Sequence, residues 1–168
     1  MRMDQNQELT AEMVVNRYSE HELADIIWKY GEERFSRRIA KGIVYARRKK
    51  AVQLCSELAG IIEKAVGRKG RIHPATRTFQ ALRIEVNREL EELSSVIFSG
   101  AEILAEGGRF CVLSYHSLED RIVKNAFKKL ASEGIFNIIT RKPLVPGQEE
   151  QRLNPSSRSA KLRVGERI

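Results

Sequence analysis

The stretch HPATRTFQALRIEVN, residues 73–87, decides how the middle of this chain folds. Pro74 suits the start of a helix, where its missing N–H would have had no partner anyway. From this point apolar side chains recur at steps of three and four residues and so share one helix face. These side chains are Phe79, Leu82, Val86, Leu90, Leu93, Ile97, Ala101 and Leu104. We therefore expect one long helix from about Ala75 to Gly107-Gly108.

A second, polar stripe runs beside the apolar one. It consists of Thr76, Gln80, Arg83 and Asn87. These side chains are rich in hydrogen-bond donors and include no carboxylate. The stripe ends after three turns, because the same face carries an apolar side chain by Phe98. The first half of the helix is therefore expected to contact a polar partner.

The composition is that of a globular domain, with 42% hydrophobic and 31% charged residues in a chain of 168. The sequence contains no apolar run of about 18 residues, which predicts no membrane span. It shows no secretory signal, so a cytoplasmic location is expected. Cys55 and Cys111 lie in apolar surroundings and are expected to be buried, free thiols, with a disulfide as the alternative. Neither has a metal-ligand partner at suitable spacing, so we expect no metal site.

The net charge of +8 is concentrated in particular segments. Residues 1–28 hold six acidic and two basic side chains, whereas residues 29–50 hold nine basic and two acidic ones. Residues 137–168 hold seven basic and three acidic ones. Such segments favour a polyanion partner, because neutralising phosphates releases counterions. A solvated basic surface is the alternative.

Helices are expected to dominate the first part of the chain. Before the long helix they cover approximately residues 10–16, 19–30, 32–50 and 54–66. Thr10 suits the N-cap of the first helix, and Ser19 with Glu22 fits a capping box for the second. Gly67 is expected to end the fourth helix. The basic segment GRKGRIHP, residues 67–74, is expected to form a loop.

The third expected helix has two distinct faces. Phe35, Ile39, Ile43 and Ala46 form its apolar face. Arg34, Arg38, Lys41, Tyr45 and Arg48 form a basic one. A basic stripe with one tyrosine fits along an RNA backbone and offers a ring for stacking. A solvated face whose long stems cover apolar surface is the alternative interpretation.

The pattern changes after Gly107-Gly108. Residues 110–113 form a continuous apolar run, which predicts a strand buried on both faces. Ser117 with Asp120 fits a capping box for a following helix to about residue 131, and residues 136–140 and 160–164 are further strand candidates. The fold class is therefore α/β, helix-rich with two or three strands. So few strands would leave an apolar edge open, which favours the later portion of a larger α/β protein.

Residues 73–87 also resemble, nearly residue for residue, the signature of bacterial SAM-dependent methyltransferases of the RsmH/MraW type. That family modifies the exocyclic amine of a cytosine in small-subunit ribosomal RNA. Four further stretches agree in order: MRMD (1–4), YGEERFSRRIAKGIV (30–44), SYHSLEDRIVK (114–124) and NPSSRSAKLRVGER (154–167). Tyr115 stands where phenylalanine is usual, and Ser156-Ser157 where Arg-Ala is frequent. The resemblance covers essentially this whole chain, but only the later part of the family's chain.

The resemblance implies a Rossmann-like methyltransferase sheet into which an all-helical domain is inserted. Residues 1–4 would be a remnant of an upstream motif, 5–72 the inserted substrate-recognition domain, and 73–168 the C-terminal part of the methyltransferase domain. The family's residues for S-adenosyl-L-methionine lie upstream of MRMD, so none maps onto this chain. No glycine pair here follows a strand and opens a helix with the dinucleotide-fold spacing. We therefore expect no SAM binding by this chain alone.

The substrate side of the site is what remains. His116 and Ser117 follow the predicted strand and are the catalytic candidates, since ligands bind at that end of open α/β sheets. A structural histidine and a capping serine are the alternatives. The expected RNA contacts are Arg34, Arg38, Lys41, Arg48, Arg71, Arg77, Arg83, Arg158, Lys161 and Arg163. Gln80 and Asn87 either belong with them or bond to another domain.

Three hypotheses follow. The chain is a fragment of a ribosomal-RNA cytosine methyltransferase, catalytic only with its cofactor half. Alternatively, it is a stand-alone helical RNA-binding or ribosome-associated module, or a truncated product that folds poorly. The first two hypotheses predict ribosomal RNA or the small ribosomal subunit as the partner. No membrane partner is expected.

Overall fold

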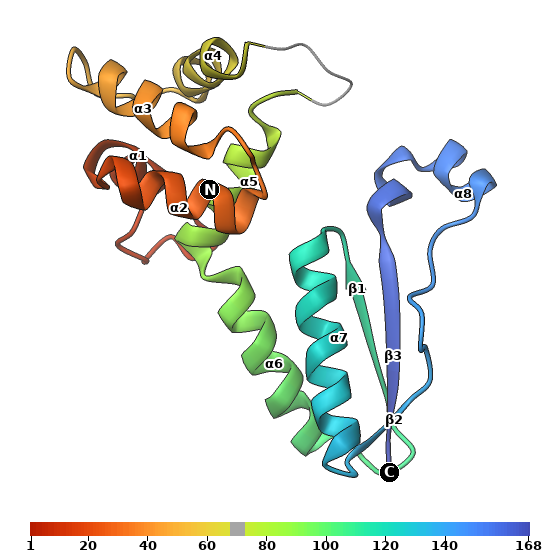
Figure 1. The fold of residues 1–168 in the computed structure, drawn as a ribbon. Coiled ribbons are helices and arrows are strands. Elements are labelled where there is room, and N and C mark those ends of the chain that lie inside the picture. The colour runs from red at the N-terminus through yellow and green to blue at the C-terminus, as the bar shows by residue number, and fades with distance from the viewer. Residues whose placement is uncertain (68–72) are drawn as a thin grey trace. The chain divides into compact units, whose positions relative to one another are not determined.

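The computed structural model describes residues 1–67 and 73–168. It forms two compact units, Met1–Glu89 and Leu90–Ile168 (Figure 1). The expected basic loop at residues 67–74 lies mostly outside the described residues, so it stays a prediction. The units divide the chain at a different place from the predicted domains, 5–72 and 73–168, and that assignment within a larger protein also stays a prediction.

The first unit is helical. Its helices are α1 (Ala11–Arg17), α2 (Glu20–Gly31), α3 (Ser36–Arg47), α4 (Cys55–Val66) and α5 (Thr76–Asn87). The sequence signals at their ends are confirmed. Thr10 accepts the backbone N–H of Met13, and Ser19 and Glu22 form the expected capping box. Gly67 ends α4 in the left-handed conformation, with φ of 66°.

Helix α3 begins later and ends earlier than the sequence predicted. Glu32 takes a left-handed conformation, with φ of 47°, which separates α2 from α3. The carboxylate of Glu33 is buried and accepts the backbone N–H of Phe35 at 3.0 Å. An acidic side chain therefore does lie at the positive end of α3, just before its first turn.

The core of the first unit lies between these helices. Its largest fully buried apolar side chains include Leu23, Ile27, Ile39, Ile43, Ile62 and Leu82. Helix α2 packs against both α3 and α5, and α3 packs against α4. A Cβ on Gly31 would lie 2.6 Å from the backbone oxygen of Arg77, so this close approach of α2 to α5 requires glycine.

The single long helix predicted from residue 75 to residue 106 is wrong, because the structure has two helices there. Helix α5 ends at Asn87, and α6 (Glu89–Ile103) begins two residues later. Between them Arg88 has φ of 52° and caps α5 by donating its N–H to the carbonyl of Ile84. Apolar periodicity marks which faces are buried and continues across such a one-residue break. The helices on either side contribute to different compact units.

The second unit combines helices with a small sheet. After α6 it contains β1 (Arg109–Ser114), α7 (Ser117–Ser132), β2 (Phe136–Ile138), α8 (Gln148–Leu153), a short 3-10 helix (Pro155–Ser159) and β3 (Lys161–Arg167). Strand β3 lies between β1 and β2 and is antiparallel to both (Figure 1). The expected α/β class and both further strand candidates are confirmed at this level.

Strand β1 is not buried on both faces, contrary to the prediction. Phe110 and Val112 pack into the core formed with α6 and α7, but Cys111 and Leu113 alternate with them and are exposed. Among the described residues β1 pairs only with β3, so its other edge is open, as the small number of strands predicted. The predicted burial of Cys55 and Cys111 is wrong too. Both cysteines are free and exposed, Cys55 because it is the first residue of α4.

No helix among the described residues is both long enough and apolar enough to cross a membrane.

Candidate nucleic-acid interface

Helix α3 presents a continuous basic face. Its buried side chains Ser36, Ile39, Ala40 and Ile43 lie on one side, and the helix itself contains no Asp or Glu. On the opposite side, continued by the turns just before and after the helix, the α3 basic face consists of the exposed Arg34, Arg37, Arg38, Lys41, Tyr45, Arg48 and Lys49. Arg37 and Lys49 were missed by the sequence analysis, although the same helical spacing places them there. Tyr45 is the aromatic side chain of this face and is 63% exposed.

The cations of the α3 basic face are available to a ligand. None of them forms an ion pair with a carboxylate of the described residues; Arg34 instead lies over the ring of Phe35 and Lys49 over that of Tyr45. Arg47, in the same helix, behaves differently. Its guanidinium donates to the carbonyl of Val15 at 2.7 Å and to that of Tyr18 at 2.5 Å, and so satisfies the end of α1. Arg47 therefore has a structural role, whereas the arginines of the α3 basic face lie on the surface.

Arg77 and Arg83, expected to contact RNA, are engaged within their own unit. Arg77 donates to the carbonyl of Glu32 at 3.3 Å, and its guanidinium lies 3.8 Å from the carboxylate of Glu33. Arg83 makes two hydrogen bonds to the carboxylate of Glu89, at 2.8 and 3.0 Å. A bidentate pair of this kind fixes the guanidinium and neutralises its charge locally. Both side chains are better placed to hold α5 than to bind phosphate.

The polar stripe on α5 does meet polar groups, as predicted, and they belong to the same unit. Gln80 donates to the carbonyl of Tyr30 at 3.0 Å. Asn87 donates to the carbonyl of Met1 at 3.0 Å and accepts the N–H of Met3 at 2.8 Å. The amide side chains therefore tie α5 to α2 and to the first residues of the chain.

In the second predicted basic patch, Arg158, Lys161 and Arg163, the last two bind the carboxylate of Asp120. This carboxylate accepts from Arg163 at 2.6 Å and from Lys161 at 3.2 Å, and joins α7 to β3. Arg163 is only 6% exposed. Burial raises the pKa of Asp120, but the hydrogen bonds and charges of Arg163 and Lys161 outweigh it and lower the pKa below its ordinary value. Arg158, in the short 3-10 helix, is exposed, and Arg71 lies outside the described residues.

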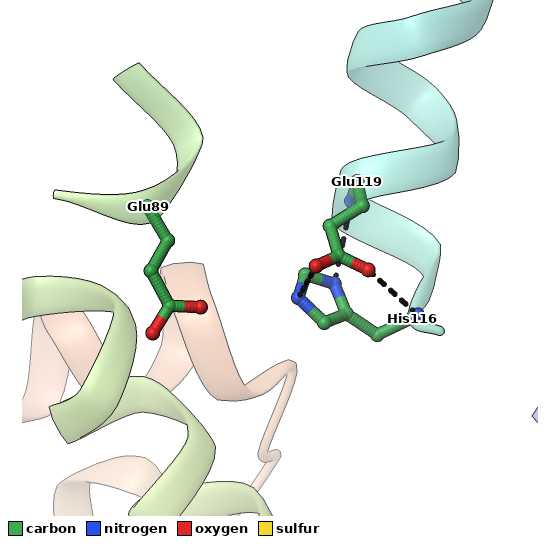
Figure 2. A group of neighbouring side chains, drawn as sticks. All are labelled: Glu89, His116 and Glu119. Atoms are coloured by element: carbon green, nitrogen blue, oxygen red, sulfur yellow. Dashed lines mark hydrogen bonds and ion pairs between the residues drawn. The ribbon is translucent and has the colours of Figure 1, made fainter. Parts of the chain in front are cut away.

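His116, rather than Ser117, is the N-cap of α7, so the predicted Ser117–Asp120 capping box is wrong. Nδ1 of His116 accepts the backbone N–H of Glu119 at 3.3 Å, and Glu119 accepts the N–H of His116 at 3.2 Å (Figure 2). Glu119 also accepts the N–H of Tyr115 at 2.8 Å. Nε2 of His116 lies 3.3 Å from the other oxygen of Glu119. Nδ1 is therefore the acceptor atom of this capping contact. The ring thus holds the turn after β1.

Ser114 and Tyr115, at the end of β1, differ in how deeply they are buried. Ser114 is buried, and its hydroxyl has no hydrogen-bond partner among the described residues, whereas Tyr115 is half exposed. The catalytic candidates His116 and Ser117 lie at this end, as expected for the residues after the strand. Their catalytic role stays a prediction, as do the expected lack of a metal and of SAM binding by this chain alone.

Comparison with known proteins identifies the relatives of this chain. The model of the MraW methylase family matches residues 1–168. The chain belongs to this family. The expected resemblance is thereby confirmed over the whole sequence given. Among curated MraW-family relatives, the ribosomal RNA small subunit methyltransferase H of Persephonella marina is 54% identical over 171 residues. The protein of the same name from Clostridioides difficile is 50% identical over 186 residues.

The similarity covers this MraW-family chain more fully than it covers the relatives. The two alignments include 100% of the chain but only 58% and 60% of the relatives. A third relative of that name, from Coprothermobacter proteolyticus, is 54% identical over 98% of the chain and 55% of its own length. The chain therefore spans less than two thirds of the length of these curated relatives.

Proposed function

We propose that this chain contributes the RNA-contacting helical unit and the C-terminal sheet of a SAM-dependent methyltransferase. Its reaction would be methylation of the exocyclic amine of a cytosine in 16S ribosomal RNA, in the cytoplasm. The observation that carries the proposal is the α3 basic face, in a chain whose relatives are named ribosomal RNA methyltransferases. Its seven exposed residues have no carboxylate partner in the described part of the chain.

The chemistry divides between this chain and a cofactor half. Transfer to an exocyclic amine requires alignment of the nitrogen with the methyl group, an acceptor for the amine proton, and a base held out of its stack. The α3 basic face supports the third requirement by holding the phosphates near the target. The alignment of the methyl group depends on SAM, which we assign to the part of the relatives outside the match.

The sheet offers a place for that cofactor half. Strand β1 has one unpaired edge among the described residues, and Cys111 and Leu113 on it are exposed. An edge strand presents unpaired N–H and C=O groups that can extend a sheet. We infer that a strand of the cofactor half pairs here. The His116–Glu119 contact fixes the turn at the end of β1, which would then lie beside the reacting groups.

A chimera tests the proposal. This chain would replace the matched region of the Persephonella marina relative, and transfer of labelled methyl groups from SAM to small ribosomal subunits would be measured. We expect methylation of 16S RNA by the chimera and by the intact relative, and none by this chain alone. An inactive, folded chimera beside an active relative would overturn the proposal. Methyl transfer by the isolated chain would overturn the division into two halves.

A chimera with Arg34, Lys41 and Arg48 all changed to glutamine tests the role of α3. We expect KM for the subunit to rise more than kcat falls, because these residues bind RNA without touching the reacting atoms. An unchanged KM would overturn the assignment of RNA contact to this face. Changing Lys64 to glutamine on α4 provides a control for the loss of an exposed positive charge elsewhere in the unit.

One observation favours a second candidate function, a stand-alone RNA-binding module. The α3 basic face lies wholly within the Met1–Glu89 unit and needs no residue from outside it. The isolated chain should then bind RNA with an affinity that falls steeply with salt. RNA binding by the chain together with an inactive chimera would support this second function over the first.

A further inference from the structure

Tyr45 occupies a position that phosphate binding does not explain. It lies one helical turn from Lys41 and from Lys49, and Arg38 and Arg48 flank it on the same face of α3. Its side chain is 63% exposed and lies on the face of α3 opposite the buried Ile39 and Ile43. An aromatic ring surrounded by cations adds nothing to charge neutralisation. It does offer a flat apolar surface of the kind on which bases stack.

The exposed ring of Tyr45 contacts one cation of the same basic face. The ammonium group of Lys49 lies 4.9 Å from the ring centroid, as in a cation–π contact. This contact covers one face of the ring and steadies its orientation, at the cost of little freedom because tyrosine has only two rotatable bonds. A base stacked on the opposite face would bring its 5′ and 3′ phosphates towards the neighbouring cations of α3.

We propose that Tyr45 stacks on an unpaired base of single-stranded RNA while the cations of the α3 basic face hold the flanking phosphates. The proposal deepens the RNA contact of the proposed function and rests on it. In a duplex the faces of the bases are stacked on one another and a side chain on a helix surface cannot reach them. The site therefore selects looped or otherwise single-stranded segments over duplex RNA.

A second exposed aromatic residue in the same unit provides a contrast. Trp28 on α2 is 61% exposed, but α2 carries Glu20, Glu22 and Asp25 and belongs to the acidic part of the chain. Carboxylates on the same helix repel the phosphates that a base stacked on Trp28 would bring. Trp28 is therefore a control for Tyr45, since the two rings are similarly exposed and α2 carries three acidic side chains and one basic one, Lys29.

The first experiment measures binding of the full chain to a single-stranded RNA of about 12 nucleotides and to the same sequence as a duplex. Tyr45→Ala should weaken binding to the single strand about tenfold and leave duplex binding unchanged, whereas Trp28→Ala should change neither. Tyr45→Phe should restore the affinity, because stacking uses the ring. The salt dependence of Tyr45→Ala should match that of the unaltered chain, whereas Lys41→Gln should reduce the slope by about 0.7.

The second experiment uses fluorescence. Trp28 is the sole tryptophan of the chain, so Trp28→Phe combined with Tyr45→Trp moves that fluorophore to the proposed site. Single-stranded RNA should quench this emission, because base stacking contacts the ring directly, and should leave the emission of the unaltered chain almost unchanged.

Several results would overturn the proposal. They are equal loss of single-strand and duplex affinity in Tyr45→Ala, no loss in either, failure of phenylalanine to restore binding, or no quenching in the Tyr45→Trp protein. If the unaltered chain binds neither RNA, the RNA contact of the proposed function fails as well. If the unaltered chain binds RNA and only the effects of the Tyr45 variants are missing, the stacking proposal fails but the RNA contact stands.

Discussion

Replacing Asp120 with asparagine, a side chain of nearly the same shape, should strongly lower the unfolding free energy of the Leu90–Ile168 unit. The change removes the charge that pairs with Arg163 and Lys161, at 2.6 and 3.2 Å. Removing one partner of a buried pair costs about 3–5 kcal/mol. The side chain of Arg163 is 7% exposed but that of Lys161 is 37% exposed, so only one cation is left stranded. We therefore expect the lower end of that range, about 3 kcal/mol.

Hydrogen exchange followed by mass spectrometry is the suitable assay. Trp28 lies in the first unit, so tryptophan fluorescence does not report on the second. The amides of β3 should exchange about 100-fold faster in Asp120→Asn, since 1.4 kcal/mol corresponds to a factor of ten. Amides of α2 and α3 in the first unit serve as internal references.

Glu166→Gln is the matched control in the same sheet. Its carboxylate accepts from Arg109 at 2.9 Å, but Arg109 is 66% exposed, and such surface pairs contribute about 0–1 kcal/mol. If Asp120→Asn accelerates exchange no more than Glu166→Gln does, the argument from burial is refuted. Adding Arg163→Met to Asp120→Asn should recover part of the loss, because an apolar side chain then replaces the stranded cation.

The pH dependence has a definite sign. The pKa of Asp120 is lowered in the folded protein, so its pair stabilises the unit above the ordinary carboxyl value of about 4. The stabilisation disappears as the pH falls through the lowered folded-state pKa. The difference in urea midpoint between the unaltered chain and Asp120→Asn should therefore be full at pH 7 and shrink below about pH 4.

Three further predictions concern other residues. Both cysteines should react with a thiol reagent in the native protein without denaturant, since both are free and exposed; a thiol that needs unfolding to react would contradict this. Arg47→Ala should lower the unfolding free energy of the first unit by about 1.5–3 kcal/mol in urea titrations followed by Trp28 fluorescence, whereas Arg48→Ala should leave it nearly unchanged. Burial and the hydrogen bond to Glu85 raise the pKa of Tyr18 to about 12, so its contribution is full below pH 10 and is lost as the pH rises towards 12. Ultraviolet absorbance should show one tyrosine fewer titrating at high pH in Tyr18→Phe, and stability of that variant should depend less on pH above 10.

Local signals in the sequence predicted several helix ends. Thr10, the Ser19–Glu22 capping box and Gly67 act on groups within three or four residues, so their spacing is enough to identify them. The break at Arg88 was not predictable in this way. Arginine in the left-handed conformation carries no local signature, and glycine, the residue that usually marks it, is absent there.

The candidate site was predictable only where helix geometry decides it. The α3 basic face follows from spacing alone, since its members recur at steps of three and four. The engagement of Arg163 depends on Asp120, 43 residues away in sequence, which no pattern in the sequence specifies. The same contact explains why the Ser117–Asp120 box failed. Asp120 is used by β3, and the overlapping pair His116 and Glu119 caps the helix instead.

The order of the strands has a consequence for synthesis. Strand β3 follows every other described element in the chain but occupies the middle of the sheet, where it supplies hydrogen bonds to both β1 and β2. Of the described strands, a nascent chain translated only to residue 160 holds β1 and β2 but not β3, which pairs with both. These pairings must therefore wait until β3 has left the ribosomal exit tunnel, whereas the helical unit can fold well before.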